Sequence, residues 1–182
     1  MNRQEEKTQE AIFKAFFSLL SKKSFQKIRI GELTNEANIG RSTFYSHFSS
    51  KDDLLTAVCH HLFEHVFITS SFFEHQPDEI STVEKLEHRI AHLFQHFKEN
   101  EEKITTLYHL EDDYFLRSLK EELDKNLVPL LAPIYFQDSA LPNSLITQYI
   151  SETFISVLNW WLHIKDDVST SQLTNYYLQL LR

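Results

Sequence analysis

The chain has 182 residues, 42% hydrophobic and 13% aromatic, which argues against a disordered chain and predicts a folded protein with a sizeable core. Only two glycines and four prolines occur, so sheets joined by tight turns are disfavoured and long helices are expected. The single cysteine, Cys59, excludes an intramolecular disulfide. Without an apolar leader or 18 consecutive apolar residues, we expect a cytoplasmic protein that does not enter a membrane.

The net charge of −8 is distributed unevenly along the chain. Residues 1–54 carry nine basic and seven acidic residues, whereas residues 55–182 carry nine and nineteen. Within residues 22–51, six lysines and arginines stand against only two glutamates. A basic segment in an otherwise acidic chain indicates a nucleic-acid contact near the N-terminus.

Near the N-terminus, hydrophobic periodicity predicts one long helix followed by two short ones. An apolar stripe with helical spacing predicts a helix over about residues 4–22; its members are Ile12, Phe16, Leu19 and Leu20. Two shorter helices are expected over 30–37 and 41–48. Asn38 lies between them, and asparagine tolerates a left-handed turn better than any residue except glycine.

The rest of the chain also reads as helices, for a total of about nine. Ser50 with Asp53, Ser81 with Glu84 and Ser169 with Gln172 have the spacing of N-terminal caps. Pro129 and Pro133 should kink or end the helix in which they fall. The expected helices span about 50–74, 81–100, 104–110, 112–131, 142–164 and 169–181.

Residues 28–54 have the pattern of a helix-turn-helix, in which the second short helix enters the major groove of DNA. Phe44 and Phe48 should anchor that helix on its neighbours. Its outer face offers small polar and basic groups to base edges, and Lys51 lies at a helix N-terminus that favours a phosphate. The residues that we expect to contact DNA are Arg29, Arg41, Ser42, Thr43, Tyr45, Ser46, His47 and Lys51.

Residues 8–55 closely resemble the N-terminal domain of the TetR family of bacterial regulators. The resemblance rests on the segment from Gly40 to Phe48, GRSTFYSHF, and on Lys51-Asp52-Asp53-Leu54 after it. It implies a three-helix DNA-binding domain over 1–50 and a larger helical regulatory and dimerisation domain over 51–182. Asn38, Gly40 and Ser24 depart from the family's usual residues, but the first two are conformationally acceptable in a turn.

The C-terminal half is similar to one branch of that family, some members of which resemble activators tied to dihydroxyacetone metabolism. That role is not carried over. The resemblance implies that the last two helices form a homodimer, and we expect Trp160 or Trp161 at its interface, although both rings could instead lie in the monomer core. The interface residues expected are Leu158, Trp160, Leu173, Tyr177, Leu180 and Leu181.

The function expected from these features is that of a DNA-binding transcriptional regulator, a repressor released by an unknown small molecule, on a pseudo-palindromic duplex. There are two alternatives to a repressor released by a small molecule. One is an activator, and the other is a metal sensor that uses the helical stripe of His88, His92 and His96. We expect no cofactor, no metal and no enzymatic activity, because phosphate-binding and nucleophile motifs are absent. Aromatic residues that could line an effector pocket are Phe94, Phe97, Tyr108, Phe115, Tyr149 and Trp161.

Overall fold

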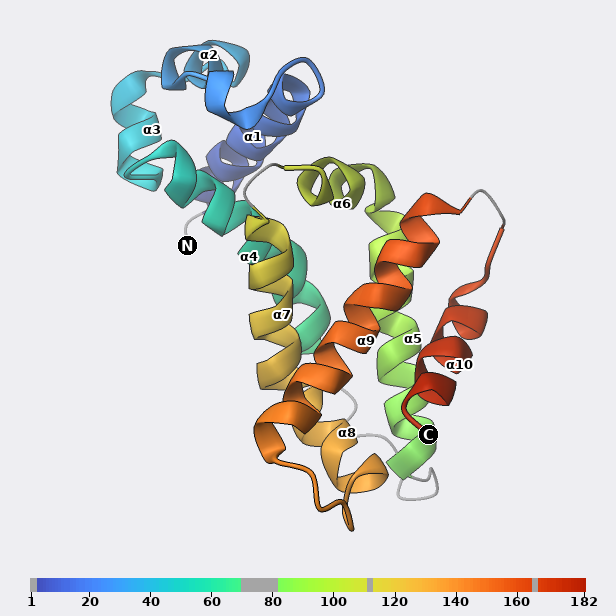
Figure 1. Cartoon of the computed structure of the whole chain (residues 1–182). Helices are drawn as coiled ribbons and strands as arrows, with labels where there is room; N and C mark the ends of the chain where they lie inside the picture. Colours follow the sequence, from blue (N-terminus) through green and yellow to red (C-terminus); the bar gives the residue numbers. More distant parts are fainter. Residues whose placement is uncertain (1–2, 70–81, 111–112, 165–166) are drawn as a thin grey trace.

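A computed structural model describes the backbone of residues 3–69, 82–110, 113–164 and 167–182. The described residues form ten α-helices and one short 3-10 helix with no strand, which confirms the all-α prediction. No helix in these ranges is long and apolar enough to cross a lipid bilayer. The helices α1 (Arg3–Leu20), α2 (Ile30–Glu36) and α3 (Arg41–His47) lie together at one end of the molecule (Figure 1). The helices α5 (Thr82–Glu99), α9 (Asn143–His163) and α10 (Thr170–Leu180) lie at the other end, and α4 (Lys51–Thr69) and α7 (Tyr114–Asn126) connect the two.

The N-terminal part has the predicted three-helix arrangement with a left-handed turn. Asn38 adopts a φ of 52°, as the sequence predicts, and the Ile39 N–H donates to the Thr34 carbonyl at 2.9 Å, which closes the turn after the second helix. The elements here are α1 (Arg3–Leu20), η1 (Phe25–Lys27), α2 (Ile30–Glu36), α3 (Arg41–His47) and α4 (Lys51–Thr69).

The C-terminal part contains one more helix than the sequence indicates. The single helix expected over 112–131 is two helices that meet at Leu127, because Pro129 has no N–H for the helical ladder and its ring clashes with the preceding turn. Pro129 therefore lies in the first turn of a new helix. The elements are α5 (Thr82–Glu99), α6 (Glu101–Tyr108), α7 (Tyr114–Asn126), α8 (Val128–Tyr135), α9 (Asn143–His163) and α10 (Thr170–Leu180).

Two of the three predicted helix caps are formed. The Ser169 hydroxyl accepts from the Gln172 N–H at 3.2 Å, and the Gln172 side chain accepts from the Ser169 N–H at 2.9 Å. The Ser50 hydroxyl accepts from the Asp53 N–H at 3.0 Å, whereas the Asp53 carboxylate turns to the N–H of Ser49. The third pair begins with Ser81, which lies outside the described residues, as does the end expected near residue 74 for the fourth helix.

One hydrophobic core runs the length of the molecule. Phe16 and Phe44 are fully buried at the N-terminal end, and Phe94 and Phe154 are fully buried at the other, where their rings stack 4.8 Å apart. Helix α4 contributes to both ends, from Leu54 to Phe63. Because this core is continuous across residue 50, the boundary expected there between a DNA-binding domain and a regulatory domain stays a prediction.

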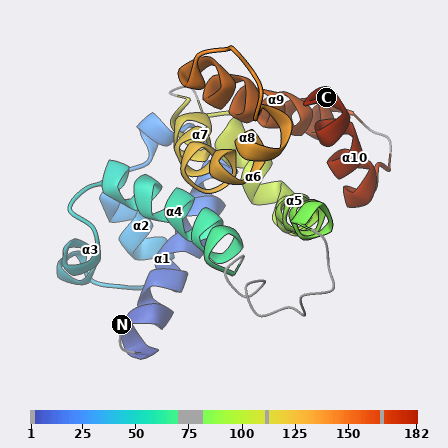
Figure 2. The ribbon, with the colours of Figure 1, turned by 90° about the horizontal axis from the view of Figure 1, so that it is seen from below.

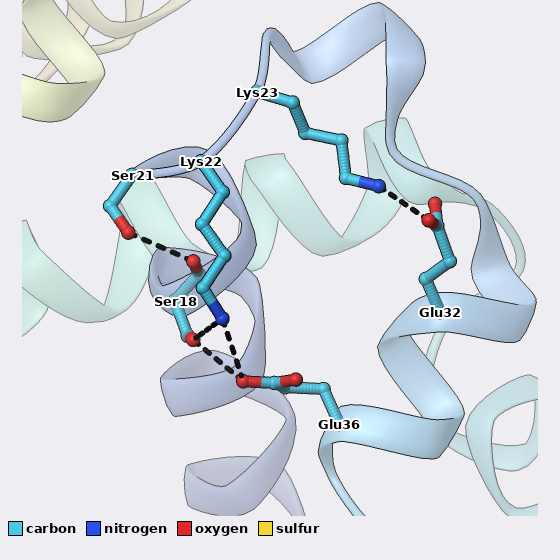
Figure 3. Close-up of polar contacts among 6 residues, drawn as sticks. All are labelled: Ser18, Ser21, Lys22, Lys23, Glu32 and Glu36. Atoms are coloured by element: carbon cyan, nitrogen blue, oxygen red, sulfur yellow. Dashed lines mark hydrogen bonds and ion pairs between the residues drawn. The ribbon is translucent and has the colours of Figure 1, made fainter.

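Polar side chains hold α2 against α1 in what we call the α1–α2 clamp: Ser18, Lys22 and Lys23 with Glu32 and Glu36 (Figure 3). The Ser18 hydroxyl donates to Glu36 at 2.6 Å, and the Lys22 ammonium lies 3.5 Å from the same carboxylate. Lys23 donates to Glu32. The hydrogen bond from Ser18 and the charge of Lys22 lower the pKa of Glu36, and Lys23 with the Arg29 N–H lowers that of Glu32.

Lys51 ties the start of α4 to the short η1 segment. Its ammonium donates to the carbonyl oxygens of Phe25 at 2.7 Å, Ile28 at 3.3 Å and Gln26 at 3.4 Å. It also lies 4.3 Å from the centre of the Phe25 ring, in cation–π geometry. The three donors of an ammonium are thus directed into the protein, and we assign Lys51 to the fold rather than to the phosphate contact that the sequence suggests.

We predict that Lys51→Ala lowers the free energy of unfolding by about 1–2 kcal/mol, the range for hydrogen bonds to a part-exposed charged group. Urea unfolding followed by circular dichroism measures this loss. Lys27→Ala is the control, because Lys27 is exposed in the same segment. Unchanged stability of Lys51→Ala would return the residue to the list of candidate phosphate contacts.

A second prediction concerns how the stability of the protein changes at acidic pH. Because the pKa of Glu36 is lower in the folded chain than in the unfolded chain, the stability that it contributes is present above the ordinary glutamate pKa and is lost as pH falls through the lowered value. Glu36→Gln should therefore reduce the loss of stability between about pH 5 and pH 3. Ser18→Ala, which removes the main cause, should act in the same direction. Identical pH profiles for wild type and both variants would refute the clamp.

Candidate nucleic-acid interface

The two phenylalanines predicted to anchor α3 do so. Phe44 is fully buried and Phe48, at the C-terminal cap of α3, is 5% exposed. Their rings lie 5.8 Å apart, and Phe48 stacks on Phe13 of α1 at 6.1 Å. A helix of seven residues is not stable alone, so these aromatic contacts fix both its position and its orientation.

Helix α3 lies at the outer edge of the molecule (Figure 2), and the face opposite its two phenylalanines is exposed. Ser42, Tyr45 and Ser46 are exposed, Tyr45 by 54%, while Thr43 and His47 are half-buried at the edges of this face. The Ser46 hydroxyl donates to the Thr43 carbonyl at 2.8 Å. Ser46 therefore offers its oxygen as an acceptor, whereas hydroxyls with a free proton can both donate and accept at a base edge.

The fold brings two arginines from different helices into one surface groove. Arg29 is the N-cap of α2 and Arg41 is the first residue of α3, and both line a groove over Gly31. A Cβ on Gly31 would lie 3.0 Å from Nη2 of Arg41, so the missing side chain leaves room for the guanidinium. The sequence predicts both arginines as DNA contacts but does not show that they are neighbours.

Fewer basic side chains of this region are available to a partner than the sequence suggests. Lys22 and Lys23 are paired with Glu36 and Glu32 in the α1–α2 clamp, and Lys51 is directed inward. Of the six basic residues within 22–51, Lys27, Arg29 and Arg41 are the exposed ones outside these contacts in the described structure. Two of these three residues, Arg29 and Arg41, line the groove beside α3.

The six aromatic residues proposed for an effector pocket are divided between the core and the surface, so the pocket stays a prediction. Phe94, Phe97 and Phe115 are at most 1% exposed and pack on other aromatic rings of the core. Trp161 is also buried, at 7% exposed. Tyr149 is instead 44% exposed, and its hydroxyl donates to the Leu180 carbonyl; Tyr108 packs against His109 and His163.

The residues proposed for a dimer interface divide into two groups. Trp160 and Leu180 are exposed, by 45% and 54%, as an interface requires. The other four are buried in the monomer and are corrected to core residues, because the inner faces of α9 and α10 pack on α5 and α7; these are Leu158, Leu173, Tyr177 and Leu181. The sequence missed the exposed apolar residues Leu145, Tyr149 and Tyr176 on the outer face of the same two helices.

The histidine stripe of α5 does not converge on one point in the described structure. His96 is bonded through Nε2 to the Leu62 carbonyl at 2.8 Å, so one of its ring nitrogens is already used. His88 is exposed beside α10 and His92 is half-buried. Within the described residues, no three histidine, cysteine or acidic side chains are arranged to hold a metal ion.

Known proteins resemble this chain at both the domain and the whole-chain level. Residues 12–58 match the family model for bacterial regulatory proteins of the tetR family. The chain is 36% identical over 83 residues to the uncharacterized HTH-type transcriptional regulator YxbF of Bacillus subtilis (strain 168), a match that covers 43% of this chain and 20% of the relative. The chain thus spans only about a fifth of the length of that relative.

Solved structures match over nearly the whole chain. A TetR transcriptional regulator from Streptococcus agalactiae 2603V is 35% identical, with a TM-score of 0.77, over 98% of this chain and 96% of that one. The dihydroxyacetone kinase operon activator DhaS shares the fold, with a TM-score of 0.64 at 20% identity, over 96% and 93%. The whole-chain match shows that this protein belongs to the TetR family of DNA-binding transcriptional regulators.

Proposed function

We propose that the protein binds DNA as a homodimer, with α3 as the helix that reads the major groove. The observation that carries this proposal is the division of α3 into a buried aromatic face and an exposed polar one. Arg41, Ser42 and Thr43 stand at its N-terminal end, the end that contacts base edges in helix-turn-helix proteins. Arg29 and Arg41 together supply the phosphate contacts, in place of Lys51.

The second copy covers the outer face of α9 and α10. Trp160 and Tyr176 pack edge to face at 5.8 Å, and a surface groove of about 540 Å³ beside them is lined by Val157 and Leu180. Together with Leu145 and Tyr149, these side chains form an apolar surface of the kind that soluble monomers seldom expose. A two-fold axis lets the same surface bury itself against its own copy.

Two-fold symmetry determines what kind of DNA site the dimer recognises. The two copies of α3 would enter major grooves about 34–36 Å apart or a multiple of that distance, so each half of the site has the same sequence in opposite orientation. We propose that the dimer acts as a cytoplasmic repressor that a small molecule releases from such a site. Release needs only that the ligand favours a different spacing of the two α3 helices, with coupling of about 1–3 kcal/mol.

We predict that Thr43→Ala relaxes base preference at the contacted position, with a loss of discrimination of about 1 kcal/mol or more. Sequencing of duplexes bound from a randomised pool, followed by titration of the preferred duplex, measures this loss. Thr147→Ala is the control, because it removes the same methyl and hydroxyl groups on α9, far from α3 and away from the helix face that carries Trp160. Unaltered preference in Thr43→Ala would place the reading surface elsewhere.

We also predict that Trp160→Glu dissociates the dimer. A central tryptophan is a frequent interface anchor, so its loss should raise the dimer dissociation constant at least about 30-fold. Sedimentation equilibrium measures this constant. Ile134→Glu is the matched control, because Ile134 is an exposed apolar residue on α8, outside the proposed interface. A Trp160→Glu protein that stays as dimeric as the control would show that α9 and α10 do not form the interface.

A further inference from the structure

A crevice lies where the DNA-binding end of the molecule meets the regulatory end. It has a volume of about 330 Å³ and is formed by α1, α4 and α6. These helices come from both sides of the predicted boundary, so a molecule bound there touches both parts at once. The lining residues are Glu10, Phe13, Lys14, Phe17, Val58, His61, Leu62 and Lys103.

The crevice is apolar at its base and mainly cationic at its rim. Phe13, Val58 and Leu62 are at most 8% exposed and form the base, with Phe17 partly buried beside them. Lys14, Lys103 and His61 are exposed at the rim, together with the single carboxylate of Glu10. The lining therefore combines an apolar surface with a net positive edge.

The apolar base and the cationic rim of the crevice together favour a ligand that is apolar at one end and anionic at the other. The Lys103 ammonium lies 5.9 Å from the centre of the Phe17 ring and 3.3 Å from the Asn100 side-chain oxygen, which holds it at the edge of the apolar base. An apolar ring or short chain on the base would place a carboxylate within reach of Lys103 and Lys14. A volume of about 330 Å³ is at the small end of ligand sites, which fits a molecule of one or two fused rings.

The crevice is connected to α3 through direct side-chain contacts. Phe13 lines the crevice, with its ring 5.3 Å from that of His61. The same Phe13 ring stacks on Phe48 at 6.1 Å, and Phe48 contacts Phe44 at 5.8 Å. A ligand that shifts Phe13 therefore acts on the two side chains that set the position of α3. Because packed cores change in discrete steps, we expect a small shift at Phe13 to change the orientation of α3.

We infer that this crevice is a binding site for a small amphipathic carboxylate that alters the affinity of the protein for DNA. The binding step depends only on the crevice, whereas its effect on DNA affinity rests on the proposed function. The aromatic core of the regulatory part supports this location, since Phe94, Phe97 and Phe115, which were first expected to line a pocket there, pack on Phe63 and Phe154.

The first experiment measures binding to the full chain by isothermal titration calorimetry, with 1-naphthoate as the probe and neutral 1-naphthamide as its isostere. The carboxylate should bind about fivefold more tightly, as expected for exposed ion pairs. Lys103→Gln should remove this preference, Lys103→Arg should retain it, and Lys125→Gln on α7 should leave it unchanged. Equal affinity for the two probes, absence of saturable binding, or the same loss in Lys125→Gln would overturn the site.

The second experiment repeats the DNA titration of the preferred duplex with and without 1-naphthoate at constant ionic strength. The probe should change the DNA affinity of the wild type about fivefold or more and leave that of Lys103→Gln unchanged. A probe that binds without altering DNA affinity would overturn the regulatory role. If the protein without probe fails to bind any duplex, the proposed function fails, while the calorimetric result still decides whether the crevice is a site.

Discussion

The contact of Phe48 with Phe13 and Phe44 is the constraint on which the rest of this structure depends. Helix α3 has seven residues, too few to be helical in isolation. The packing of these three phenylalanines therefore determines its position and orientation. Reading of base edges demands placement within a fraction of a hydrogen-bond length. The buried aromatic face of α3 therefore positions its exposed polar face for contact with DNA. A ligand or mutation that moves Phe13 or Phe48 should change how α3 contacts the bases.

Supporting contacts hold the elements around these anchors from two directions. The α1–α2 clamp fixes α2 to α1 through exposed ion pairs and one hydroxyl, and Lys51 fixes the start of α4 to η1. Surface ion pairs contribute little energy individually, so the clamp serves mainly to orient. The clamp also pairs two lysines of the basic segment, Lys22 and Lys23, with glutamates of the protein, so these lysines are less available to DNA. We therefore propose Arg29 and Arg41 as the phosphate contacts.

The local features of this fold were predictable from sequence because they depend on neighbours along the chain. The left-handed Asn38, the Ser169–Gln172 cap and the two faces of α3 follow from backbone chemistry and helical period. Long-range features were not predictable in the same way. Periodicity shows that Leu173 and Tyr177 share an apolar face but not whether that face meets the monomer core or a second copy. The partners of Lys51 lie 23 to 26 residues away, and no local pattern indicates them.

We propose, as the central claim, that two copies of α3, held by this aromatic anchor and related by the outer face of α9 and α10, read one duplex together. Hydroxyl-radical footprinting on the preferred duplex tests it most directly. We expect two protected segments of matching, inverted sequence whose centres lie about 10 base pairs apart or a multiple of that spacing. A single protected segment without internal symmetry, at a stoichiometry of one chain per duplex, would contradict the claim.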